Sequence, residues 1–370
     1  MMGFACSLRK MNFFIVLLSF SIFFLLLSCC SFSEAQKVPA MYVFGDSLVD
    51  VGNNDHIDSI IRADFPHNGM DYPGRKATGR FSNGNNSADF IAEKVGLPTP
   101  PPYLSDKNNV FLKGVSFASG GAGILNSTNN GVISKALHLS DQVRLFSTVQ
   151  QKLVNQLGAA AAKQQLSKSP FLILIGSNDL INYFNSDSKH PKTTPPQQFV
   201  DQMIANLKPY LQQLHGLGAR KLVIPAVPAI GCMPLLRHQH PNKTGECLDG
   251  ANYWANKYNQ GLQSMLQSLK SSLNDFNYSY FDTYNYLLTI IQNPSTYGFK
   301  EVKAACCGLG RLNAELPCTP ISTYCSERSD YIFWDRYHPT EAAASVLASA
   351  VFSGSKQYAN PVNLNQLISL

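Results

Sequence analysis

Charged residues are scarce in this sequence. Asp, Glu, Lys and Arg make up 15% of its 370 residues, against about 25% in an average soluble domain. The sequence also lacks a long block of Lys and Arg, and its formal net charge is only +6. Binding to nucleic acid needs clustered positive charge, so we expect no nucleic-acid partner. With 45% hydrophobic residues, the chain is too apolar for a disordered protein, and its composition excludes collagen and a coiled coil.

Long apolar runs are equally rare, because the only one spans residues 13–30 near the N-terminus. Arg9 and Lys10 precede this run, and small residues follow it up to Ala35. A basic start, an apolar centre and a small-residue cleavage site are typical of a secretory signal peptide, which we predict over residues 1–35. The alternative is a membrane anchor, since the run lies at the lower edge of the length that spans a bilayer. No second run follows, so we expect no transmembrane segment after signal cleavage.

The nine cysteines are an odd number, and the predicted leader accounts for it. Cleavage after residue 35 removes three cysteines and leaves six, all in the C-terminal half of the chain. In an oxidising compartment these six form up to three disulfides, in which the two adjacent cysteines bond to different partners while the pairing stays open. A zinc site is the alternative, but the chain has no C-x-x-C pairs of the kind that zinc sites use. The six candidates are Cys232, Cys247, Cys306, Cys307, Cys318 and Cys325.

Four N-x-S/T sequons, which are acceptors for glycosylation, also suit a secreted protein. Such triplets arise by chance as well, so their support for secretion is weak. The C-terminus carries neither a KDEL-type retention signal nor the hydrophobic tail of a GPI anchor. We therefore expect a secreted, extracellular glycoprotein. The sequon asparagines are Asn85, Asn126, Asn242 and Asn277.

Short apolar runs alternate with helix-like stretches along the rest of the chain. This alternation predicts an α/β fold with a parallel sheet that is covered by helices on both faces. No linker rich in Gly or Ser divides residues 36–370, so we expect a single domain there, with an exposed loop over 189–198. Ser140 and Asp141 are expected to cap one helix, and Pro339 to open the last. Strands are predicted over 38–44, 110–117, 171–175, 221–227 and 278–281, and helices over 87–95, 140–157, 199–217, 251–273 and 339–351.

Polar residues directly after the predicted strands are the candidates for a site, because ligands bind beyond the carboxyl ends of parallel strands. Ser47 follows the first strand and can act as a nucleophile, although Ser and Asp here also suit a helix cap. Gly120, Gly121 and Gly123 follow the second strand, and their N–H groups can bind an oxyanion or simply form a turn. Asn178 follows the third strand, where its amide can donate to an oxyanion, although Asn is also a common turn residue.

Two familiar motifs are missing at these positions. No G-x-S-x-G elbow surrounds Ser47, so an ordinary α/β-hydrolase is not implied. The glycine-rich stretch after the second strand has neither the spacing nor the Lys of a nucleotide-binding loop. Near the C-terminus, Asp335 and His338 are three residues apart, a spacing at which a carboxylate can orient an imidazole. The second imidazole nitrogen is then free to take a proton from a hydroxyl, although a lone His is usually structural.

Together these segments resemble the GDSL esterase/lipase family of the SGNH hydrolase superfamily, and in particular its plant secreted branch. The Gly-Asp-Ser-Leu motif lies at residues 45–48, Gly-Ser-Asn-Asp at 176–179 and Asp-Arg-Tyr-His at 335–338. One departure is Ser116, where the second block of the family usually has Asn. The matching segments are, in chain order, residues 44–54, 79–84, 88–93, 114–124, 176–179 and 335–338.

The resemblance implies a three-layer α/β/α, flavodoxin-like domain and a role for each matching residue. Ser47 would be the nucleophile, His338 the general base and then the acid, and Asp335 the residue that orients His338. The oxyanion hole would consist of the backbone N–H groups of Ser47 and Gly121 together with the side chain of Asn178. The reaction would pass through an acyl-enzyme, and it would need no metal and no organic cofactor.

The resemblance therefore implies a serine carboxylic-ester hydrolase that is secreted to the apoplast, with the vacuole or another secretory compartment as alternatives. Its substrate would be a small-molecule or lipid ester, such as a lipid, acylated cell-wall material or an acylated secondary metabolite. An acyltransferase that passes the same acyl group to an alcohol stays open as an alternative, because it needs the same residues. A binding protein on this scaffold is a further alternative, against which the intact Ser47, Asp335 and His338 argue.

Overall fold

The computed structural model describes most of the chain after the predicted leader. The predicted signal peptide over 1–35 lies outside the described residues, as do residues 189–193 of the loop predicted over 189–198. Residues Lys37–Leu370 form one compact unit. Within the described part, no helix is both long enough and apolar enough to cross a bilayer. The described residues are 36–129, 135–185, 194–240, 242 and 244–370.

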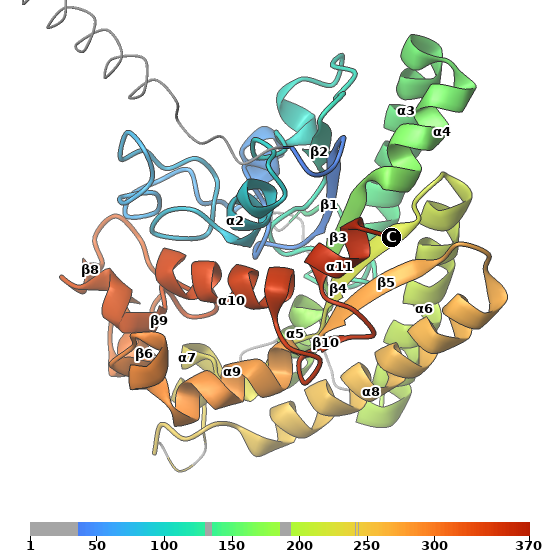
Figure 1. The fold of residues 1–370 in the computed structure, drawn as a ribbon. Coiled ribbons are helices and arrows are strands. Elements are labelled where there is room, and N and C mark those ends of the chain that lie inside the picture. Colours follow the sequence, from blue (N-terminus) through green and yellow to red (C-terminus); the bar gives the residue numbers. More distant parts are fainter. Residues whose placement is uncertain (1–35, 130–134, 186–193, 241, 243) are drawn as a thin grey trace, which may run out of the picture. The chain divides into compact units, whose positions relative to one another are not determined.

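A six-stranded sheet lies at the centre of the fold, in the order β10-β5-β4-β3-β1-β2 (Figure 1). Strands β1 to β5 run parallel to their neighbours, and the edge strand β10 pairs antiparallel with β5. The predicted α/β fold with a mostly parallel central sheet is therefore confirmed. The order 2-1-3-4-5 of the parallel strands is that of flavodoxin-like doubly wound sheets. The strands are β1 (Met41–Gly45), β2 (Gly114–Ser116), β3 (Pro170–Leu174), β4 (Lys221–Pro225), β5 (Asn277–Phe281) and β10 (Ala359–Asn360).

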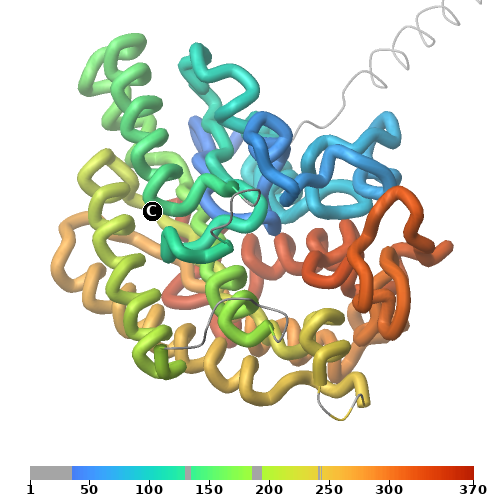
Figure 2. The backbone as a smooth tube through the Cα atoms, turned by 180° about the vertical axis from the view of Figure 1, so that it is seen from behind, coloured from blue at the N-terminus to red at the C-terminus, as the bar shows by residue number. Residues whose placement is uncertain are grey.

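The side chains of each strand alternate between the two faces of the sheet, and each face has its own core. Tyr42 and Phe44 of β1 belong to one cluster of buried residues, whereas Met41 and Val43 belong to the other. Helices cover both faces, and Figure 2 shows α3, α6 and α8 along one side of the molecule. The helices of the first face are α3 (Leu139–Leu157), α4 (Ala159–Lys168), α6 (Pro196–Gly216) and α8 (Asp249–Ser272), and those of the second are α2 (Ser87–Lys94), α10 (Glu341–Ser353) and α11 (Leu364–Ile368).

Strand β2 is shorter than the predicted span 110–117. Phe111 has a positive φ of 56°, and the N–H of Gly114 donates to the carbonyl of Phe111, so the chain turns here before the strand begins. The predicted loop over 189–198 is also too long at its C-terminal end, because Pro196 is the first residue of α6. Proline suits this first position, since an N–H there would have no partner within the helix.

Two predicted helix starts are wrong as well. Helix α3 begins at Leu139 with His138 at the cap position, because the Ser140 hydroxyl donates to the side chain of Asn126 and caps nothing. Helix α10 is capped by Thr340, whose hydroxyl oxygen accepts the N–H of Ala343 at 3.2 Å. Pro339 therefore lies before the helix and does not open it. The predictions had the right helices but placed their first residues one to two positions away.

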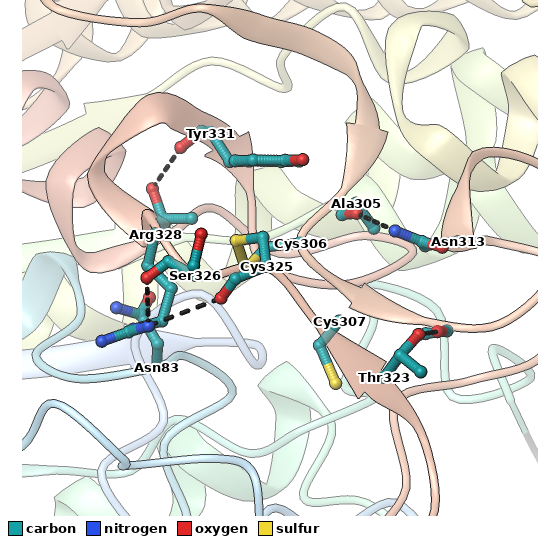
Figure 3. Close-up of a disulfide and its surroundings, with 12 residues drawn as sticks. Asn83, Ala305, Cys306, Cys307, Asn313, Thr323, Cys325, Ser326, Arg328 and Tyr331 are labelled. Carbon is teal, nitrogen blue, oxygen red and sulfur yellow. Dashed lines mark hydrogen bonds between the residues drawn. A yellow bond between two sulfur atoms is a disulfide. The ribbon is translucent and has the colours of Figure 1, made fainter.

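Residues 301–334, which we call the cysteine arm, form two small sheets of their own. Strand β6 (Glu301–Ala305) pairs parallel with β9 (Tyr331–Phe333), and β7 (Cys307–Gly308) pairs antiparallel with β8 (Thr323–Tyr324). Figure 3 shows Cys306 and Cys325 joined, with Arg328 donating to the carbonyls of Cys325 and Ser326. All six cysteines after residue 35 are paired in disulfides, so none is left as a zinc ligand. The disulfides are Cys232–Cys247, Cys306–Cys325 and Cys307–Cys318.

Candidate active site

The carboxyl ends of the central strands bring the predicted site residues to one edge of the sheet. Ser47 follows β1, Gly121 lies in the loop after β2, and Asn178 lies in the first turn of α5 (Ser177–Phe184), directly after β3. Asp335 and His338 come from the connection between β9 and α10. All five residues line one pocket with a volume of about 490 Å³. Segments almost 300 residues apart in sequence thus meet where the doubly wound sheet changes direction.

Ser47, His338 and Asp335 form a continuous hydrogen-bonded chain. The Ser47 Oγ lies 2.7 Å from Nε2 of His338, and Nδ1 of His338 lies 2.8 Å from both carboxylate oxygens of Asp335. Ser47 and His338 are each 7% exposed, so the pair is largely shielded from water. One imidazole nitrogen therefore faces the carboxylate, while the other faces the hydroxyl. This is the arrangement in which a carboxylate orients an imidazole toward a nucleophile.

The carboxylate of Asp335 stays ionised although it is buried. Burial acts to raise its pKa, but the charge and the hydrogen bond of His338 act against it and keep the pKa below the usual value. The backbone N–H groups of Tyr337 and His338 also donate to Oδ1, at 2.8 and 2.9 Å, and lower the pKa further. A negative Asp335 stabilises a positive charge on His338, as proton transfer from a hydroxyl requires.

The turn that carries Asp335 is held from the cysteine arm. The N–H of Trp334 donates to the carbonyl of His338 at 2.8 Å, which closes the turn. The N–H groups of Cys306 and Cys307 donate to the carbonyls of Phe333 and Trp334, at 2.9 and 2.7 Å. The two disulfide-bonded residues thus hold the backbone immediately before Asp335. The sequence predicted disulfides in this region but not this connection to the site.

On the opposite side of the pocket, Gly45 allows β1 and β3 to approach closely. A Cβ atom at Gly45 would lie 2.3 Å from the carbonyl oxygen of Leu174, and its φ of 154° lies outside the range that other residues readily adopt. The side chain of Gln142 from α3 accepts from the N–H of Gly45 and donates to its carbonyl, at 2.8 and 2.7 Å. The backbone just before Ser47 is therefore fixed by a glycine and a buried amide.

Asp50 links the serine loop to the glycine-rich loop, and sequence reasoning gave it no role. Its Oδ1 accepts the N–H groups of Gly52 and Asn53, and its Oδ2 accepts the N–H of Gly120, at 2.8 to 2.9 Å. Asn54 donates to the carbonyl of Gly120 at 2.9 Å. Both residues lie in the segment 44–54 that carries the family resemblance, so the signal was present. Their function became evident only when residues about seventy positions away came into contact.

The residues predicted to form the oxyanion hole line the pocket, and each has an N–H group that donates to no acceptor within the described structure. Among the described residues, the backbone N–H groups of Ser47 and Gly121 have no hydrogen-bond acceptor. Gly121 has a φ of 79°, the left-handed conformation that glycine adopts without strain. The side-chain amide of Asn178 donates to the carbonyl of Ala122 at 3.0 Å, which fixes its orientation and uses one of its two hydrogens. Three donors can therefore converge on one oxygen atom of a bound molecule.

Three other buried carboxyl groups surround these loops, and burial raises the pKa of each. The pKa values are about 7 for Asp46, about 7 for Asp50 and about 6 for Asp179. Asp179 accepts the N–H groups of Ile124 and Leu125 and so holds the far end of the glycine-rich loop. Asp46 accepts only the N–H of Leu48, at 3.0 Å, and its Oδ2 has no partner in the described structure.

The predicted sequon asparagines differ in exposure. Asn126 and Asn242 are exposed, whereas Asn85 and Asn277 are half-buried. Asn277 is the first residue of β5, and its side-chain oxygen accepts from Lys270 at 2.7 Å. Ser116, which departs from the family pattern, is fully buried in β2 with an unpartnered hydroxyl, while its carbonyl accepts from Asn53. The carbonyl of residue 116 thus connects β2 to the serine loop, and the side chain of Ser116 takes no part in this connection.

A doubly wound sheet with a hydrogen-bonded Ser, His and Asp at its edge is an arrangement typical of serine hydrolases. A family model described as GDSL-like Lipase/Acylhydrolase matches residues 41–351. The chain is 46% identical to the GDSL esterase/lipase At5g55050 of Arabidopsis thaliana over 347 residues, which are 91% of each chain. It is 38% identical to the GDSL esterase/lipase At4g16230 of the same plant, over 94% of this chain and 96% of that one. The protein belongs to the GDSL esterase/lipase family, which is a family of carboxylic-ester hydrolases.

Proposed function

We propose that this protein hydrolyses a carboxylic ester through an acyl-enzyme on Ser47. The observation that carries the proposal is the 2.7 Å contact between Ser47 Oγ and His338 Nε2, with Asp335 on the other imidazole nitrogen. Membership in the esterase/lipase family supports an ester substrate. The natural substrate is an acylated small molecule or a lipid ester, and lipids, acylated cell-wall material and acylated secondary metabolites are the proposed classes.

In the first step, Ser47 Oγ attacks the ester carbonyl carbon and its proton passes to Nε2 of His338. The carbonyl oxygen becomes negative and accepts from the N–H groups of Ser47 and Gly121 and from Asn178. The bond from carbon to the alcohol oxygen then breaks, and His338 gives its proton to the departing alcohol. Asp335 keeps its negative charge throughout and stabilises the imidazolium.

In the second step, a water molecule attacks the acyl-enzyme. His338 takes a proton from the water, the carbon–Oγ bond breaks, and the proton returns to Ser47 as the acid leaves. An alcohol in place of the water would give acyl transfer, so the two activities differ only in the acceptor. Measuring the ester product in the presence of competing alcohols separates them.

The proposed location is the secretory pathway, with the leader over 1–35 removed and the apoplast as destination. The three disulfides support it, because disulfides persist in oxidising compartments. N-terminal sequencing of the secreted protein tests it: a chain that begins near Gln36 is expected, and a chain that retains residues 13–30 would support an anchor instead.

The test of the catalytic assignment is turnover of p-nitrophenyl esters by purified wild type and by Ser47→Ala and His338→Ala. We expect each variant to keep the wild-type fold and to lose about 10³-fold or more in kcat, with Asp335→Asn losing less than His338→Ala. Ser177→Ala is the matched control, because Ser177 lines the same pocket whereas the imidazole of His338 bonds to Ser47 and Asp335, and it should stay close to wild type. Wild-type turnover in Ser47→Ala would refute the assignment.

A further inference from the structure

A second cavity lies directly behind the catalytic pocket, on the other side of Leu48. Its volume is about 70 Å³ and its lining is almost entirely apolar. It is lined by the ends of β3, β4 and β5, by α2 and α10, and by α9 (Thr283–Gln292). In Figure 1, α10 lies between α2 and α9. The residues that form its far end are Ile91, Leu287, Leu347, Ala348 and Val351.

The two cavities share a wall. Leu48, Met233 and Tyr337 line both of them, and these three residues are neighbours of the proposed machinery. Leu48 follows Ser47 directly, and Tyr337 precedes His338. The side chains of Leu48, Met233 and Tyr337 are therefore shared by the catalytic pocket and the apolar cavity.

Packing alone does not explain the cavity. Protein cores are close-packed, and a void of this size forfeits contacts that a larger side chain at residue 348 or 351 would supply. An apolar cavity also has no groups that could hold ordered water, and such cavities bind apolar ligands instead. The lining of the catalytic pocket differs, because Arg62 and Asn182 add polar groups to its wall.

We propose that the apolar cavity receives the acyl chain of the ester, with Leu48, Met233 and Tyr337 forming the passage from Ser47. This rests on the proposed function, since it is the acyl group on Ser47 that must enter. The alcohol part of the ester then stays in the larger, more polar pocket. A cavity of about 70 Å³ has room for only a few methylene groups, so the favoured acyl chain is of medium length, and octanoyl is the probe chosen for it.

The test compares kcat/KM for p-nitrophenyl acetate, octanoate and dodecanoate. In the wild type, octanoate is expected to exceed both acetate and dodecanoate. Ala348→Leu fills the far end of the cavity, and each methylene that loses burial costs about fourfold, so the octanoate-to-acetate ratio should fall about tenfold or more. Ser349→Leu is the matched control on the same helix, because Ser349 does not line the cavity, and it should leave the ratio at the wild-type value.

A second variant, which enlarges the cavity, keeps the test valid if Ala348→Leu fails to fold. Val351→Ala enlarges the cavity, so the preferred ester should become longer and the dodecanoate-to-octanoate ratio should rise. A direct readout without turnover is the thermal unfolding of Ser47→Ala in the presence of sodium octanoate. Octanoate should raise the midpoint of this variant, and the rise should disappear when Ala348→Leu is added.

The outcomes distinguish this proposal from the proposed function. The acyl-cavity proposal is wrong if the wild type hydrolyses esters but the folded variants keep its chain-length preference. This means that the octanoate-to-acetate ratio of Ala348→Leu and the dodecanoate-to-octanoate ratio of Val351→Ala both stay within twofold of wild type. The Ser47 mechanism stands in that case. If the wild type hydrolyses none of the three esters, the proposed function fails, whereas octanoate binding to Ser47→Ala still reports on the cavity by itself.

Discussion

The two sides of the catalytic pocket are built by different physical means. The serine side, which comprises Ser47 and the glycine-rich loop, extends from strands of the main core and is fixed by buried hydrogen bonds of Asp50 and Gln142. The histidine side, which comprises Asp335 and His338, extends from the cysteine arm. Its own cluster of fully buried residues is small, and three of them are cysteines. Where the buried core is too small to order the backbone, disulfide crosslinks supply the missing stabilisation.

The carboxyl groups on the two sides also differ. Asp335 on the histidine side accepts several hydrogen bonds and lies against an imidazole, so its pKa is lowered despite its burial. Asp46 on the serine side is buried with a single N–H donor, and its pKa rises to about 7. Asp50 accepts three N–H groups and its pKa is still about 7, so the charged imidazole beside Asp335, and not the number of donors, decides which carboxyl group is ionised.

The largest effect is expected from opening the disulfide on the histidine side. Cys306→Ser with Cys325→Ser removes a crosslink that holds the backbone before Asp335, so the free energy of unfolding should fall by about 2–4 kcal/mol. We expect kcat for acetate hydrolysis to fall as well, because Asp335 loses its support. Urea unfolding and steady-state kinetics measure the two quantities.

The control for this variant is the disulfide outside the cysteine arm. Cys232→Ser with Cys247→Ser opens a loop of similar length, 15 against 19 residues, so the loss of stability should be comparable. Its loss of kcat should be smaller, because this loop contains no residue of the proposed triad and its backbone contact with the turn of Asp335 and His338 is the N–H of Leu235, which donates to the carbonyl of Arg336 at 3.1 Å. Equal losses of kcat in the two variants would contradict the positioning role of the arm.

A smaller effect is expected on the serine side from Asp50→Asn. The two oxygens of the carboxylate accept three backbone N–H groups. Because the Asn side chain has only one oxygen, at least one of these N–H groups would face the NH₂ group of the amide, which is itself a donor. We expect the free energy of unfolding to fall by about 1–3 kcal/mol, and kcat to fall because the N–H of Gly121 shifts. Asp141→Asn on the exposed start of α3 is the control, and an Asp50→Asn variant that matches it would disprove the role of Asp50.

The smallest effect concerns the pH dependence of stability. Asp46 has a pKa of about 7 in the folded protein and an ordinary value of 3.8, so between these values the folded state holds a proton that the unfolded chain has lost. Its contribution to stability is therefore complete below about pH 4 and is lost as the pH rises through 7, by at most about 1.4 kcal/mol per pH unit. Asp50 and Asp179 act in the same direction.

Asp46→Asn isolates this contribution. In urea unfolding at pH 4.5, 5.5, 6.5 and 7.5, the variant should lose less stability with rising pH than wild type does. Asp335 does not disturb the comparison, because its lowered pKa affects stability only in more acidic solution. A pH profile identical in variant and wild type would show that Asp46 does not carry this proton.

Much of the fold was predictable because its strands are buried on both faces. The run from Phe171 to Ile175 is apolar without a break, which predicts a central strand, and β3 spans Pro170–Leu174. Strand β2 was less predictable, since Phe111 is buried in the core without being part of the strand. The helix starts were less predictable, because Ser140 donates to Asn126 and does not cap α3, and because Thr340 caps α10 in place of Pro339.

The sequence by itself determined the order of the α/β elements and which polar residues follow the strands, because both depend on local patterns of apolar and polar residues. It also supplied six cysteines after residue 35, an even number that allowed three disulfides to be predicted. Only the tertiary structure decided the pairing of those cysteines, the link from Asp50 to Gly120, and the apolar cavity beside Leu48. These features depend on distances between segments far apart in the chain, which are fixed only when the parallel strands align.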